Sequence, residues 1–282
     1  MENQIRTVLL LGMLSGLLLA VGYLLGGMSG LTFAIAFAII MNWGSYFWSD
    51  RIALFMYKAK ELKAEEQPKL FSMVKDVASR AGLPMPRVFL IPSEQSNAFA
   101  TGRNPTHASI AVTRGILSLL DEQELKGVIA HELSHVKNRD ILVATIAATI
   151  ASVISYVGFV ARWGAIFGGF GGRDNDRGGI LELLLLAIVT PLIALLLQLA
   201  ISRSREYLAD ETGARILRDS SGLASALEKL EQDTKRHPLR LGSPASAHLF
   251  ITNPFTKKGL LGMLSTHPPM EKRIARLRQL RF

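Results

Sequence analysis

Residues 131–135 read HELSH, in which two histidines stand four positions apart with a glutamate beside the first. Positions i and i+4 share one face of a helix, so the imidazoles of His131 and His135 can reach one metal ion. Glu132 is rotated from them by about 100°, where its carboxylate can hold a water molecule and take a proton from it. The pattern predicts hydrolysis at a zinc site. The alternative is a solvated polar helix face that matches by accident, and it is disfavoured because the chain has only 6 histidines.

A hydrolytic zinc needs a third protein ligand and keeps a fourth position open for water. The chain has no cysteine, so this ligand must be a histidine or a carboxylate. Glu206 and Asp210 lie four apart in the segment SRSREYLADETGA. We predict that Glu206 binds the metal and that Asp210 accepts the second N–H of a ligating imidazole, most simply that of His131. On spacing alone, the alternative is that these acids merely form ion pairs with Arg203 and Arg205, as is common on charged helices.

Four apolar runs approach or reach the length of about 20 residues that a membrane-spanning helix requires. They are Thr7 to Gly26, Leu31 to Trp48, Ile141 to Ala161 and Leu183 to Ile201. The first run resembles a cleaved signal peptide, but a second run follows it so closely that we predict a retained hairpin. The expected fold is therefore α-helical in the membrane, with four transmembrane helices and a soluble part of mixed class.

The third and fourth runs explain how distant ligands could meet. His135 lies about 9 Å of helical rise before the third run, and Glu206 about 8 Å after the fourth. An antiparallel hairpin of these runs would bring both ligands to one height above the membrane. Because no loop signal separates HELSHVKNRD from the apolar residues that follow, we predict one continuous helix across this junction.

The chain divides accordingly into four segments with alternating character. Residues 1–50 form a membrane hairpin, residues 51–140 the first part of a soluble domain, residues 141–201 a second hairpin, and residues 202–282 the rest of the soluble domain. Lysine and arginine gather after the second and fourth runs, which places both soluble segments and both termini in the cytoplasm. The net charge of +9 fits a membrane surface. No aromatic residues interleave the basic clusters, which argues against nucleic-acid binding.

The soluble segments read as an α+β domain. The stretch EEQPKLFSMVKDVASRAGL has apolar residues at helical spacing, and a second helix is expected to begin near Asp121 and to run through the HELSH motif. Three short strands are expected between these helices. They are Arg87 to Ile91, Asn97 to Thr101 and Ala108 to Thr113.

Several separate stretches carry a resemblance to a known family. HELSHVKNRD, EYLADETGA, SNAFATG, AHLFITNPF and STHPPMEKRI, with the placing of the four apolar runs, resemble the HtpX-type membrane zinc metalloproteases, relatives of the CAAX prenyl endopeptidases. The resemblance covers almost the whole chain. It implies a gluzincin-like domain facing the cytoplasm of a bacterial-type inner membrane. It further implies one zinc ion on His131, His135 and Glu206, with Glu132 as the base. The implied role is quality control of membrane proteins under stress, with polypeptide substrates, and it is compatible with a homo-oligomer.

Further residues gain candidate roles from this resemblance. His267 and Arg273 match positions near the zinc that could stabilise an oxyanion, although the prolines before Arg273 also fit an ordinary helix start. The strand beginning Asn97, Ala98 and Phe99 resembles the edge strand on which such proteases hold an extended substrate, or it is a simple core strand. From their place in the sequence, Asn138 and Asp140 are predicted to brace the zinc-binding helix or to cap its junction with the membrane.

Three alternatives differ in what they demand of the sequence. A CAAX-type prenyl-protein endopeptidase would need more spans to enclose a large chamber. A zinc transporter would place its polar ligands within the spans, whereas these lie outside them. A non-catalytic zinc-binding scaffold would not need Glu132, which is present. A metalloprotease is therefore the favoured interpretation.

Overall fold

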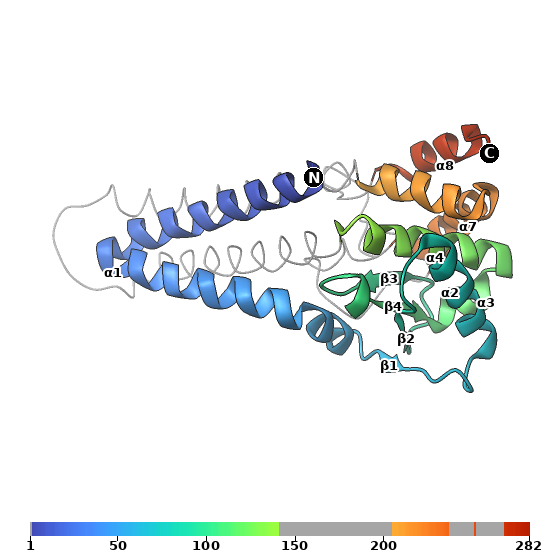
Figure 1. Ribbon diagram of the computed structural model, residues 1–282, viewed down its shortest axis with the longest axis horizontal. Helices are drawn as coiled ribbons and strands as arrows, with labels where there is room; N and C mark the ends of the chain where they lie inside the picture. The colour runs from blue at the N-terminus through green and yellow to red at the C-terminus, as the bar shows by residue number, and fades with distance from the viewer. Residues whose placement is uncertain (1, 141–204, 237–250, 252–267) are drawn as a thin grey trace. The chain divides into compact units, whose positions relative to one another are not determined.

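The structure is a computed structural model that describes residues 2–140, 205–236, 251 and 268–282 (Figure 1). The chain forms two compact units. The first contains Met1–Ser45, and the second contains Tyr46–Thr145 and Leu199–Phe282. Every candidate site residue that the structure describes lies in the second unit. The third and fourth apolar runs lie outside the described residues, and so does His267.

The chain begins with helix α1, which spans Glu2–Met56 and consists of two arms (Figure 1). The arms meet at Gly26 and Gly27, whose backbone dihedrals are not helical. Gly27 has a φ of 56°, a conformation that costs glycine little because it lacks a Cβ. Within the described part of the chain, no helix combines the length and the apolar character that crossing a membrane requires. The prediction of four transmembrane helices is therefore not confirmed.

A four-stranded sheet forms one layer of the second unit. Its strands are β1 (Lys60–Glu61), β2 (Arg87–Ile91), β3 (Ala98–Thr101) and β4 (Ser109–Thr113), in the order β1-β2-β4-β3. β2 and β4 are parallel, and the two outer pairs are antiparallel. The three predicted strands agree with β2, β3 and β4 to within one residue, and β1 was not predicted. β3 lies at an edge of the sheet.

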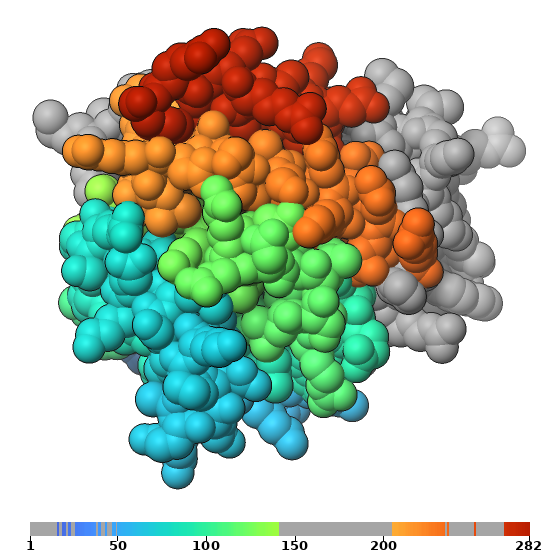
Figure 2. Space-filling view, turned by 90° about the vertical axis from the view of Figure 1, so that its right-hand side faces the viewer, coloured from blue at the N-terminus to red at the C-terminus, as the bar shows by residue number. Residues whose placement is uncertain are grey.

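Helices cover the sheet and complete the core. They include α2 (Pro68–Ala81), α3 (Arg114–Leu119), α4 (Glu122–Lys137), the helical residues 205–217, α7 (Ser221–Arg236) and α8 (Met270–Gln279), with a short 3-10 turn at Pro105–His107. Figure 2 shows α8 in red above the orange segments, with the green α4 below them. One hydrophobic core joins these layers and includes Val74 of α2, Ile110 of β4, Ile129 of α4 and Leu227 of α7.

Helix α4 ends earlier than the sequence suggested. It stops at Lys137, with Asn138 as its C-cap, and Arg139 adopts a positive φ of 58°. A left-handed residue breaks the helical hydrogen-bond series, so the predicted continuous helix across this junction is wrong. The residues at the break, Asn138 and Arg139, form a turn before Asp140.

The start of α4 is anchored by a reciprocal capping box. The Glu124 amide donates to Asp121 Oδ1 at 2.9 Å, and the Asp121 amide donates to Glu124 Oε2 at 3.0 Å. The same Glu124 carboxylate accepts from Ser225 Oγ at 2.6 Å and from Lys229 Nζ at 2.7 Å, both on α7. One buried carboxylate therefore joins the helix that carries the HELSH motif to its neighbour.

We expect Glu124→Ala to lower the free energy of unfolding by about 2 kcal/mol, because a helix cap and a buried charge-assisted bond are lost together. For a domain of this size the melting temperature should fall by about 4–8 °C. Glu122→Ala is the matched control on the same turn, since Glu122 is exposed and pairs with Lys126. It should change stability by less than about 0.5 kcal/mol. Equal shifts for both variants would contradict the assignment.

The contribution of Glu124 should also depend on pH. Burial alone would raise the pKa of Glu124, but its bonds to Lys229 and Ser225 hold that pKa below the ordinary value of 4.5. A lowered carboxyl pKa stabilises the fold above the unfolded pKa and loses its effect as pH falls through the folded pKa. The difference in melting temperature between the native protein and Glu124→Gln should therefore shrink below pH 4.5.

Candidate metal centre

The candidate metal ligands come from two helices that touch backbone to backbone. His131 and His135 lie on the last turns of α4, and Glu206 lies in the helical residues 205–217. A Cβ on Gly213 would lie only 3.0 Å from the His131 backbone nitrogen. Glycine at this position therefore lets the second helix approach close enough for its carboxylate to reach both imidazoles.

His131, His135 and Glu206 bring three potential ligand atoms together within 4.8 Å. The two Nε2 atoms are 3.2 Å apart, His135 Nε2 lies 3.4 Å from Glu206 Oε1, and His131 Nε2 lies 3.7 Å from Glu206 Oε2. Two ligands of a tetrahedral ion with bonds of about 2.0–2.1 Å lie about 3.3–3.4 Å from each other. The spacing of the three donors therefore fits one tetrahedral metal ion.

Each imidazole has a buried carboxylate behind its other nitrogen. His131 Nδ1 donates to Asp210 Oδ1 at 2.9 Å, and His135 Nδ1 lies 3.4 Å from Asp140 Oδ2. A carboxylate on Nδ1 fixes the proton there and leaves Nε2 as the donor to a metal. The structure thus brings Asp210 to the histidine named for it, and brings Asp140 to His135 through the turn at Arg139.

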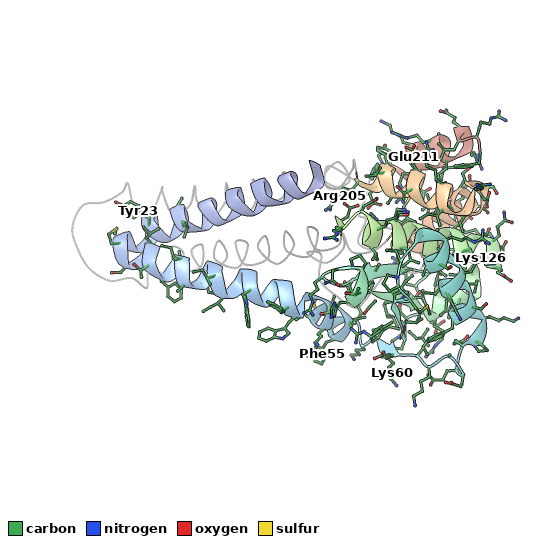
Figure 3. The ribbon with its side chains drawn as sticks, viewed as in Figure 1. Tyr23, Phe55, Lys60, Lys126, Arg205 and Glu211 are labelled. Carbon is green, nitrogen blue, oxygen red and sulfur yellow. The ribbon has the colours of Figure 1, made fainter. Side chains whose placement is uncertain are left out.

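Arg273 of α8 is fully buried and connects the acidic groups of the centre. Its Nε and Nη2 atoms lie 2.8 and 2.7 Å from the two oxygens of Asp210. Its Nη1 atom lies 3.1 Å from Glu206 Oε2. A second arginine, Arg205 (labelled in Figure 3), donates to the Asp140 carbonyl at 3.3 Å. Two guanidinium groups therefore compensate the carboxylates around the ligands.

Glu132 is buried beside the ligands and is held by the sheet. The Ala100 amide of β3 donates to Glu132 Oε2 at 2.9 Å. Sequence reasoning did not find this contact, although the alternation of β3 could have shown that Ala98 and Ala100 share one side. One oxygen of the carboxylate is therefore fixed by a backbone group.

The local environment moves the pKa values of these groups in opposite directions. Burial lowers the pKa of His131, and Arg273 lowers it further. Burial raises the pKa of Glu132 to about 8, with Glu206 adding to the effect. Burial opposes the charged form of His135, but the bonds to Asp140 and Glu206 raise its pKa to about 10. For Asp210, Arg273 and His131 outweigh burial and lower the pKa.

The other predicted site residues lie in different surroundings. Asn138 caps α4, and its side chain does not reach the ligands by any described hydrogen bond. The Phe99 ring is buried against Tyr57, with ring centroids 5.7 Å apart. Asn97 Oδ1 accepts from the Ala98 amide at 3.1 Å. The roles predicted for these residues, and for His267, stay predictions.

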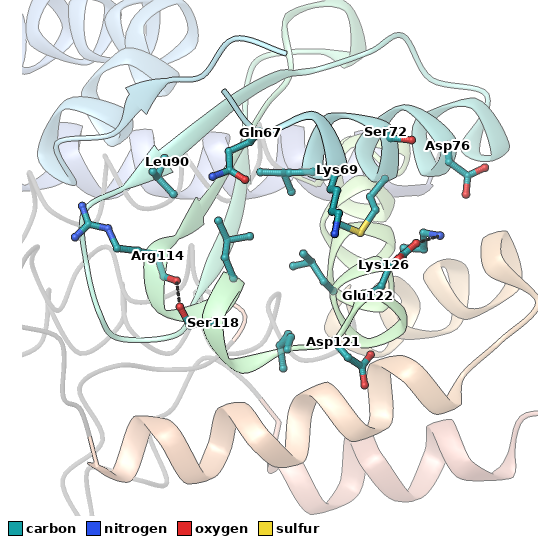
Figure 4. A pocket seen from close by; sticks show the side chains of 15 residues that line it. Gln67, Lys69, Ser72, Asp76, Leu90, Arg114, Ser118, Asp121, Glu122 and Lys126 are labelled. Carbon is teal, nitrogen blue, oxygen red and sulfur yellow. Dashed lines mark hydrogen bonds and ion pairs between the residues drawn. The ribbon is translucent and has the colours of Figure 1, made fainter. Parts of the chain in front are cut away.

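A large groove elsewhere on the second unit does not include the candidate metal ligands. Figure 4 shows it between α2, α3 and the start of α4. Its lining includes Lys69, Arg114 and Glu122 beside apolar residues such as Leu70 and Leu117. None of the predicted site residues lines this groove.

We expect Asp210→Asn to weaken metal binding about 10- to 100-fold, because the amide no longer stabilises the orientation and basicity of His131 as a carboxylate does. Asp140→Asn should act on His135 in the same direction and less strongly, since its contact is longer. Metal affinity would be measured by competition with a chromophoric chelator. Asp219→Asn, a change in an exposed capping carboxylate, serves as the control. Native affinity in Asp210→Asn would contradict the assignment.

Comparisons with known proteins agree with this geometry. The model of peptidase family M48 matches residues 64–281. The chain is 52% identical to a protease HtpX homolog from Desulforapulum autotrophicum, over 99% of this chain and 90% of the relative. It is 50% identical to a protease HtpX homolog from Thermococcus sibiricus, over 98% and 95%. The crystal structure of S. mikatae Ste24p has a similar fold, with a TM-score of 0.56 at 19% identity, over 98% of this chain and 65% of that one. The chain therefore belongs to peptidase family M48 and is a metalloprotease.

Proposed function

We propose that the chain is a zinc-dependent endopeptidase that hydrolyses peptide bonds of unfolded or membrane proteins. The observation that carries this proposal is the tetrahedral spacing of His131, His135 and Glu206 beside the buried Glu132. Two imidazoles and one carboxylate form a donor set that zinc commonly takes in hydrolytic sites, with a fourth position left for water. The HELSH motif assigns the two imidazoles and the base to one helix.

The proposed chemistry is general-base hydrolysis. When bound, zinc would lower the pKa of a water molecule and polarise the carbonyl of the peptide bond. Glu132 takes the proton of the attacking water and returns it to the leaving amine. The Ala100 amide donates to one oxygen of the Glu132 carboxylate and so fixes the plane of this group, which orients its other oxygen. No covalent bond to the protein is needed.

The remaining polar residues of the centre position the ligands. Asp210 and Asp140 keep the two Nε2 atoms turned toward each other. Arg273 orients both Glu206 and Asp210, because its three nitrogens are directed at these two carboxylates. Stabilisation of an oxyanion by Arg273 and His267 remains part of the proposal.

The proposed place of action is the cytoplasmic face of a bacterial-type inner membrane, in the quality control of membrane proteins. Support comes from the four apolar runs and the basic residues that follow two of them. Support also comes from large apolar side chains that are exposed along the second arm of α1, among them Phe55 at its end (Figure 3). These are Phe33, Ile40, Trp43, Trp48 and Phe55. The names of the relatives agree with a protease.

The test is metal-dependent cleavage by the purified full-length protein in detergent. An unfolded polypeptide substrate should be cut by the native protein, spared after chelation, and cut again after stoichiometric zinc is restored. Fragments would be identified by mass spectrometry to show internal cleavage. Cleavage that continues at full rate in the chelated protein would exclude the proposed mechanism.

A further inference from the structure

The outer side of the edge strand β3 is already engaged by the chain. The Thr113 amide of β4 donates to the Asn97 carbonyl at 2.9 Å, so the backbone of Asn97 faces β4. Hydrogen-bonding direction alternates along an antiparallel strand, and Ala98 and Ala100 therefore face away from β4. These are the two residues of β3 that an added substrate strand would meet.

Three backbone groups on that outer side have partners among the described residues. The Ala98 amide donates to Asn97 Oδ1 at 3.1 Å, and the Ala100 amide donates to Glu132 Oε2 at 2.9 Å. The Ala98 carbonyl accepts from the Ile251 amide at 3.3 Å. The Ala100 amide is thus held by Glu132, and the Ala98 carbonyl, which is an acceptor through which an added strand could join β3, is held by Ile251.

The other end of the Ile251 residue reaches the metal centre. The Ile251 carbonyl accepts from Arg273 Nη1 at 3.2 Å, and the same nitrogen lies 3.1 Å from Glu206 Oε2. The Ile251 side chain is 1% exposed and belongs to the same core as Leu277 of α8. The amide and carbonyl of one residue thus bridge the edge strand and the arginine that contacts a candidate ligand.

We propose that Ile251 occupies the position of a substrate residue, and that a substrate binds by exchanging for it. A substrate residue offers the same backbone donor and acceptor as Ile251. Its N–H would bond to the Ala98 carbonyl and its carbonyl to Arg273 Nη1, beside Glu206. This inference rests on the proposed endopeptidase function, and it adds that the resting enzyme is inhibited by its own main chain.

The exchange has a thermodynamic consequence for substrate affinity. When only a fraction of molecules has the edge open, the apparent dissociation constant rises in inverse proportion to that fraction. Burial of the Ile251 side chain keeps this fraction small, because opening exposes an apolar group. A variant with a smaller apolar side chain at position 251 should therefore bind substrate more tightly, while the ligands and Glu132 stay in place.

Hydrogen–deuterium exchange measures directly whether a bound substrate displaces Ile251. The metal-loaded, full-length Glu132→Gln variant would be measured with and without an unfolded polypeptide, so that binding occurs without turnover. The fragment containing Ile251 should exchange faster when the polypeptide is bound, while the fragment containing Ala98 should not. Binding of the polypeptide would be followed by fluorescence anisotropy. Unchanged or increased protection of the Ile251 fragment while the polypeptide is bound would overturn this inference and leave the proposed function standing. Absence of any polypeptide binding would contradict the proposed function, and this inference with it.

A kinetic comparison supplies the second test. Ile251→Ala should lower KM for the polypeptide at least about fivefold and leave the bound metal unchanged, because the competing state loses buried apolar contacts. Val77→Ala removes a buried side chain from the same core on α2, a helix that carries none of the site residues, and it should leave KM unchanged. An unchanged or raised KM in a metal-loaded Ile251→Ala protein would overturn the proposal. If Ile251→Ala fails to fold, the hydrogen–deuterium exchange measurement on Glu132→Gln decides.

Discussion

Glu132→Gln should lower kcat for polypeptide cleavage by at least about 10³-fold, because an amide cannot accept the proton of the attacking water. The substitution keeps the size of the side chain and an oxygen that can accept from the Ala100 amide. The ligands are untouched, so the amount of bound metal should stay at one ion per chain. This variant should therefore lose activity and keep its bound metal.

Glu122→Gln is the matched control for this substitution. Glu122 lies on the first turn of the same helix and is exposed, with Lys126 as its ion-pair partner. It should keep both cleavage and metal. Cleavage would be followed by fragment release and metal by elemental analysis of the same preparation. A Glu132→Gln protein that cleaves at more than about a tenth of the native rate would exclude Glu132 as the base.

Glu206→Ala should weaken metal binding by more than about 100-fold, because it removes a direct ligand rather than a supporting carboxylate. Arg273 Nη1 would also lose its carboxylate partner, which leaves a buried cation less well compensated. We therefore expect this variant to be both metal-poor and less stable. Activity should be absent at zinc concentrations that saturate the native protein.

Glu211→Ala on the same helix distinguishes loss of a ligand from loss of a helix charge. Glu211 is partly exposed and pairs with Arg215 at 2.8 Å. Its removal should leave metal affinity within about twofold and stability within about 0.5 kcal/mol. Metal content would be titrated by equilibrium dialysis. Equal affinity in Glu206→Ala and the native protein would move the third ligand elsewhere.

The elements that carry the centre are predictable because their signals are local. Apolar spacing indicates α2, and Gly82 ends it in the left-handed conformation. The pair Asp121 and Glu124 marks the start of α4, since a capping box is visible in sequence. The HELSH motif then places two imidazoles on one face of that helix. Each of these features depends on residues only a few positions apart.

The contacts that complete the centre are harder to predict because they depend on a turn that the sequence does not signal and on burial. Asp140 reaches His135 only because Arg139 is left-handed, a conformation that arginine rarely adopts and that the sequence does not signal. A continuous helix would have turned Asp140 about 140° away from His135. Without the family resemblance, Arg273 would look like one of several arginines in a basic helix. Only the packing of α8 distinguishes it as buried.

The buried groups around the ligands also have a definite charge balance. Glu132, Glu206, Asp140 and Asp210 are four carboxyl groups, and Arg205 and Arg273 are two guanidinium groups. With all six ionised and the imidazoles neutral, these groups of the described residues carry a net charge of −2. One divalent cation would balance this charge, and the raised pKa values of Glu132 and His135 show that both groups favour their protonated forms when the charge is not balanced. Metal ligands bind in their deprotonated forms, so metal affinity at this centre should fall as the surrounding solution becomes more acidic.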